Sequence, residues 1–98
     1  MATDCQKLKN LNDLRQYVLN VLCDHNQLEP GAFPLTERIL VRGNRPCGIY
    51  FCLHGPRAVK FSAIWETERN TVLFYGATGE RVCKTQLVAA PAWEHAAA

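Results

Sequence analysis

The sequence predicts an α+β fold in which one N-terminal amphipathic helix packs on a four- to five-stranded antiparallel meander sheet. Apolar residues recur at helical spacing early in the 98-residue chain, and their period changes to two after Pro34. Short turns separate the predicted strands. They favour antiparallel neighbours, because parallel neighbours need crossover connections of about a dozen residues or more.

The composition predicts one globular domain. Hydrophobic residues make up 48% of the chain and charged residues 20%, which excludes the composition of a disordered chain. We expect an ordered core over about 8–88, with flexible ends at 1–7 and 89–98. The formal net charge of +2 is too small by itself to indicate a nucleic-acid or membrane partner.

The cysteines and the N-terminus predict a cytoplasmic protein. The chain holds five cysteines, an odd number, and none of them shares a C-x-x-C spacing. This pattern fits neither a disulfide framework nor a common zinc module, so reduced thiols are expected. The opening stretch "MATDCQKLKN" lacks the apolar block of a signal peptide, and no apolar run is long enough to span a membrane.

The helix is predicted over 11–28. Asn10 or Asn12 can cap its start, because a short side-chain oxygen satisfies an otherwise unpaired amide, and Asn26 is a reasonable stop. The following "EPGAFP" breaks the pattern into a loop. The apolar stripe of the helix comprises Leu11, Leu14, Val18, Val21 and Leu22.

The strands are predicted at 35–42, 47–54, 58–66, 71–76 and 80–88. The loop lengths place Ile39 opposite Ile49, Phe51 opposite Phe61, and Trp65 opposite Val72. In the last strand Val82 and Val88 alternate with Cys83 and Leu87, so its facing stays open. The face predicted to form the core carries Leu35, Ile39, Val41, Ile49, Phe51, Leu53, Val59, Phe61, Ala63, Trp65, Val72 and Phe74.

The opposite face of the sheet is the predicted functional surface. A single helix can cover only one side of the sheet, so this face is covered by curling of the sheet, by the C-terminal tail, or by a partner. Tyrosine and arginine are enriched at protein interfaces, and we predict a non-catalytic interaction domain that forms a homodimer. Arg38, Tyr50, Ser62 and Tyr75 are expected in one row across four strands. The predicted binding residues are Arg38, Tyr50, Cys52, His54, Lys60, Ser62, Ile64, Leu73 and Tyr75, with Leu40 on the same face.

Nucleic-acid binding by the same face is the first alternative. The stretch from Arg38 to Lys60 holds basic residues and no acidic residue, and Tyr50 and His54 could stack on bases. Such a module would use Arg38, Tyr50, Lys60 and Tyr75. The meander disperses the other cations of this stretch to the ends of the sheet, which weakens the prediction.

A cysteine-dependent enzyme centred on Cys52 is the second alternative. Cys52 and His54 lie two apart on one strand, about 6.6 Å along the chain, which is too far for a direct nucleophile–base hydrogen bond. A zinc site that combined them with Cys23 and His25 would need two helical residues turned by about 200° to converge. We therefore expect no catalytic residue, no metal and no cofactor.

Overall fold

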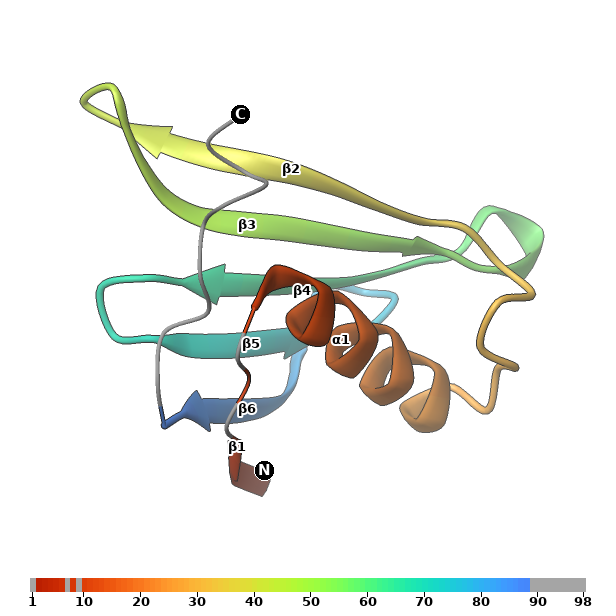
Figure 1. The fold of residues 1–98 in the computed structure, drawn as a ribbon. Helices are drawn as coiled ribbons and strands as arrows, with labels where there is room; N and C mark the ends of the chain where they lie inside the picture. The colour runs from red at the N-terminus through yellow and green to blue at the C-terminus, as the bar shows by residue number, and fades with distance from the viewer. Residues whose placement is uncertain (1, 7, 9, 89–98) are drawn as a thin grey trace.

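The computed structural model describes residues 2–6, 8 and 10–88, and these form one helix and a six-stranded sheet. Figure 1 shows α1 lying across one face of the sheet. The strand order is β1-β6-β5-β4-β3-β2, so the predicted helix on an antiparallel meander is confirmed. No helix among the described residues is long and apolar enough to cross a membrane. The elements are β1 (Ala2–Gln6), α1 (Leu11–His25), β2 (Leu35–Arg42), β3 (Arg45–His54), the 3-10 turn η1 (Pro56–Ala58), β4 (Lys60–Glu66), β5 (Thr71–Tyr75) and β6 (Arg81–Leu87).

Strand β1 is an element that the sequence did not predict. It pairs in parallel with β6 and extends the sheet beyond the meander, within the segment 1–7 that was expected to be flexible. The chain leaves β1 and enters α1 before the meander begins, so the parallel pairing joins segments far apart in sequence. The other segment expected to be flexible, 89–98, lies outside the described residues.

Helix α1 begins after Asn10 and stops at Asn26, as the sequence predicted, and the apolar stripe that reaches 28 runs past its end. The Asn10 side chain accepts a hydrogen bond from the backbone N–H of Asp13 at 2.8 Å, which caps the first turn. The helix ends at His25 with Asn26 as its C-cap, which confirms the predicted stop, and the φ of 55° at Gln27 keeps the apolar stripe from continuing as helix to 28. The residues that α1 buries are Leu11, Leu14, Val18, Leu22 and Cys23.

The sheet registers confirm two predicted pairs and correct a third. Ile39 pairs with Ile49 and Trp65 with Val72, as expected. In the β3–β4 hairpin, however, Phe51 pairs with Ala63, because η1 lengthens the turn and holds Arg57 and Ala58 at φ values of 59° and 61°. An offset of two residues returns each side chain to the same face, so the facing of both strands is unchanged.

The core lies between α1 and the middle of the sheet, on the covered face. Its largest fully buried side chains from the sheet are Trp65, Phe51 and Phe74. The prediction that Ile39 and Val41 belong to the core is wrong, because Ile39 is 36% exposed and Val41 is 62% exposed. Both lie on β2, the edge strand farthest from β1, where a register irregularity follows Leu40. The edge strand therefore extends past the cover that α1 provides.

The facing of β6 could not be assigned from the sequence. An irregularity in its pairing with β5 determines it. Phe74 pairs with Cys83 but Tyr75 pairs with Arg81, which leaves Val82 between them. Cys83, Thr85 and Leu87 are consequently buried on the covered face. Thr85 is satisfied there by a 2.8 Å hydrogen bond with the Tyr17 hydroxyl. Lys84 and Gln86 take the opposite side.

Candidate functional site: the open face of the sheet

The open face is the side of the sheet turned away from α1, which lies on the other side in Figure 1. Strand alternation and the registers place all the predicted site residues on it. They also add residues from β6 and the ends of neighbouring strands. The members of the open face are Thr36, Arg38, Leu40, Tyr50, Cys52, His54, Lys60, Ser62, Ile64, Glu66, Thr71, Leu73, Tyr75, Arg81, Lys84 and Gln86.

The central row of this face runs across five strands. The registers pair Arg38 with Tyr50, Tyr50 with Ile64, Ile64 with Leu73, and Leu73 with Lys84. The three residues in the middle are apolar or aromatic and only half-buried, and the row ends in a cation on each side. Its chemistry is therefore symmetric about Ile64.

The predicted row of Arg38, Tyr50, Ser62 and Tyr75 is wrong, because of the β3–β4 offset. Tyr50 faces Ile64, and Ser62 pairs instead with Tyr75 in the next row. The two rows are still joined, since the Tyr50 hydroxyl and Ser62 Oγ lie 3.2 Å apart. The Tyr50 side chain therefore reaches toward Ser62 of β4, which pairs with Tyr75.

Cys52 and His54 share the open face but do not form a pair. The Nε2 atom of His54 lies 3.0 Å from Thr36 Oγ1, across the β2–β3 hairpin. Cys52 is only 5% exposed. The histidine that a nucleophilic Cys52 would need as a base is thus turned to Thr36.

Gly48 is a tightly packed position on the open face, where it pairs with Leu40 and Glu66. A Cβ atom there would clash with the backbone carbonyl oxygen of Trp65, so β3 and β4 approach closely at this point. The two residues that pair with Gly48, Leu40 and Glu66, line a depression of about 210 Å³. Its walls include the apolar side chains Leu40 and Ile64 and the carboxylate of Glu66.

The open face carries an excess of positive charge. Its basic side chains are Arg38, Lys60, Arg81 and Lys84, and its acidic side chain is Glu66. None of these makes an ion pair with another described residue; the ion pair within that part of the chain joins Arg15 to Glu37 on the covered side. The basic groups are therefore available to solvent or to a partner.

The residues of the hypothetical zinc site lie on opposite sides of the sheet. Cys23 and His25 belong to α1, whereas Cys52 and His54 belong to the open face. Within the described ranges, no group of three or more histidine, cysteine or acidic side chains could hold a metal ion.

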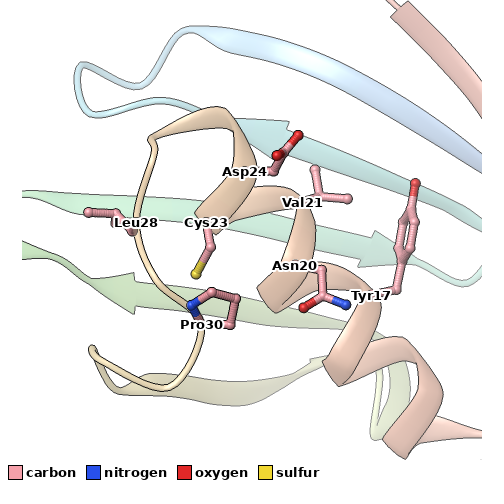
Figure 2. Close-up of a pocket in the computed structure, with 7 residues that line it drawn as sticks. All are labelled: Tyr17, Asn20, Val21, Cys23, Asp24, Leu28 and Pro30. Atoms are coloured by element: carbon pink, nitrogen blue, oxygen red, sulfur yellow. The ribbon is translucent and has the colours of Figure 1, made fainter.

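The covered side has clefts of its own, which sequence reasoning missed. Figure 2 shows one of about 430 Å³ beside the last turns of α1, where the buried Cys23 points toward Pro30 of the following loop. A smaller cleft lies between α1 and β6, and in it Cys83 Sγ is 3.4 Å from His25 Nε2. These two residues are separated by 58 positions, so no local motif signals the contact.

Comparison of the chain with models of protein families, with curated proteins and with solved structures finds no match. No relative therefore supplies a ligand or an activity. The chemistry of the open face and of the cleft between α1 and β6 is what the chain itself offers for a functional inference.

Proposed function

We propose that this chain is a small non-catalytic interaction domain whose open face binds the open face of a second copy. The observation that supports this most is the central row, with apolar residues in the middle and a cation at each end. A two-fold interface uses the same patch on both subunits, so the patch must be complementary to itself. A row that is chemically symmetric about Ile64 meets this requirement. The cysteine pattern also favours action in the cytoplasm, where thiols stay reduced.

The symmetry of the row suggests where the two-fold axis runs. An axis parallel to the strands and above Ile64 would set Ile64 against its equivalent in the other copy. Tyr50 of each copy would then contact Leu73 of the other. All three side chains are half-buried within one chain, so association would remove their remaining apolar surface from water.

The cations at the ends of the row are compatible with this arrangement. Packed sheets cross at about 30° because each sheet is twisted, so the ends of the row diverge and Arg38 and Lys84 stay solvated. Repulsion between solvated charges is screened over about 8 Å at physiological ionic strength. Added salt should therefore leave the dimer intact or strengthen it.

Light scattering behind a sizing column tests the proposal. Wild-type protein at micromolar concentration should have twice the 11.0 kDa mass of the chain. Ile64→Glu should weaken dimerisation about 100-fold or more, because it buries two unpaired carboxylates face to face. The matched control is Val41→Glu, on the opposite side of the sheet and 62% exposed, which should remain dimeric.

A crosslinking variant keeps the test decisive if Ile64→Glu does not fold. With a short thiol-reactive crosslinker, Ile64→Cys should form a covalent dimer, because the two residues would face each other across sheets about 10 Å apart, too far for a direct disulfide. Val41→Cys should not. A wild-type mass of 11.0 kDa across the micromolar range would overturn the proposal. So would equal crosslinking of the two variants.

The charge of the open face favours a second candidate, single-stranded nucleic acid. Arg81 and Lys84 join Arg38 and Lys60 around the two tyrosines of this face, on which bases could stack. Salt distinguishes the candidates, since phosphate binding weakens steeply as salt rises. Fluorescence anisotropy of a labelled single-stranded oligonucleotide at low and high salt is the measurement. Binding that Lys84→Gln weakens and salt abolishes would assign the face to nucleic acid.

A further inference from the structure

The small cleft between α1 and β6 holds a cysteine and a histidine in contact. Its volume is about 150 Å³, and His25 and Asp24 line it from the last turn of α1, while Cys83 and Lys84 line it from β6. Tyr17 and Thr85, which are joined by a hydrogen bond, also line it. A water molecule takes about 30 Å³ in the liquid, so the cleft has room for a molecule as small as hydrogen peroxide.

We propose that Cys83 is the reactive thiol of this chain, a site of oxidation by hydrogen peroxide, with His25 as the base that accepts the thiol proton. The two atoms that exchange the proton, Cys83 Sγ and His25 Nε2, lie 3.4 Å apart. Nε2 can accept when the imidazole carries its own proton on Nδ1. His25 is exposed, so it exchanges protons with solvent, and it sits in the last helical turn, where the helix dipole stabilises positive charge.

The charged groups around the pair come from both packed elements. Asp24 of α1 lines the cleft beside His25, whereas Lys84 of β6 lines it next to Cys83 in the chain but directs its side chain to the open face. Cys83 is 7% exposed, so a reagent reaches its sulfur through the cleft rather than across open surface. Small, uncharged electrophiles are therefore preferred over bulky ones.

The other described thiols lack this arrangement. Burial raises the pKa of the Cys23 thiol, which disfavours its thiolate. Cys52 shares its face with His54, but that imidazole contacts Thr36. Among the cysteines whose side chains are described, Cys83 is the one with a histidine nitrogen at hydrogen-bond distance.

The oxidation balances without a further reactant. The thiol proton passes to His25, and the thiolate sulfur attacks one oxygen of hydrogen peroxide. The S–O bond forms as the O–O bond breaks, and the leaving hydroxide takes the proton from His25 to become water. Cys83 is oxidised to the sulfenic acid, and the peroxide is reduced to water.

Alkylation mapping tests the proposal on the folded wild-type chain. Native protein is treated with less than one equivalent of iodoacetamide, and the labelled peptides are identified by mass spectrometry; Cys83 should be labelled first. His25→Gln should slow labelling of Cys83 about tenfold or more, because it removes the base. The matched control, His54→Gln, should leave the rate unchanged. After hydrogen peroxide treatment, a dimedone adduct should map to Cys83.

Two outcomes would overturn the proposal: first labelling at another cysteine, or a Cys83 rate that His25→Gln does not change. If His25→Gln fails to fold, the pH dependence of the wild-type rate decides. A histidine-assisted thiol stays reactive below the pH range where a free thiol loses reactivity, whereas an unassisted thiol follows the free-thiol profile. The cleft lies on the covered side, so this result is independent of what the open face binds.

Discussion

The two faces of one sheet differ in what covers them rather than in how their residues alternate. Trp65 and Ile64 are neighbours in β4, yet Trp65 is fully buried beneath α1 and Ile64 is only half-buried on the open face. Alternation assigns each side chain to a face, but burial depends on the layer that lies above it. The covered face therefore provides most of the stability of the fold, and the open face is the one that we propose binds a partner.

The largest contrast should come from two neighbours on β3. Phe51→Ala removes a ring that is 0% exposed and should lower the free energy of unfolding by about 3–5 kcal/mol, because it leaves a cavity. Tyr50→Ala removes a half-buried ring and its hydrogen bond to Ser62, and should cost about 1 kcal/mol in the monomer. Urea denaturation, carried out at protein concentrations too low for dimerisation, measures both losses. Equal losses would mean that something covers the open face within one chain.

Gly48 should show that the open face also has a tightly packed position. Gly48→Ala brings a methyl group against the carbonyl oxygen of Trp65, a backbone atom that cannot move aside easily. The expected loss is about 1–3 kcal/mol, as for overpacking elsewhere. Ser62→Ala, on the same face, should cost less, since it removes only a hydrogen bond to Tyr50. A tolerated Gly48→Ala would show that β3 and β4 can separate there.

Much of the fold could be predicted because its signals are local. The helix start at Asn10 and the facing of the meander up to β5 follow from capping chemistry and from alternation. The β3–β4 register could not be predicted, because Arg57 and Ala58 adopt positive φ values that non-glycine residues rarely take. Strand β1 has no period to detect and depends on a parallel pairing with β6.

The residues of the candidate sites divide in the same way, into those that a local signal predicts and those that depend on distant contacts. The predicted residues of the open face were found by alternation alone, whereas Arg81 and Lys84 were missed because the irregularity beside Tyr75 sets their facing. Ile39 alternates like a core residue but lies on an edge strand beyond the helix. The contact between Cys83 and His25 depends on how α1 crosses β6, which no spacing in the sequence encodes.

The smallest expected effect separates the charges of the two sides. On the covered side, Arg15 Nε donates to Glu37 Oε2 at 2.7 Å, with side chains 32% and 35% exposed, and this hydrogen bond raises the pKa of Arg15. An ion pair this exposed contributes about 0.2–1 kcal/mol and is screened by salt. Glu37→Gln should therefore lower the free energy of unfolding by that amount at low salt and by less at high salt.

Arg38→Gln is the control on the open face. It removes a cation that has no ion pair with a described residue, so the stability of the monomer should stay unchanged. A double-mutant cycle with Arg15→Gln, followed by denaturation at two salt concentrations, makes the comparison. A loss from Glu37→Gln that salt does not reduce would mean that the carboxylate acts through packing on α1, and an equal loss from Arg38→Gln would mean that the open face holds its cations in place.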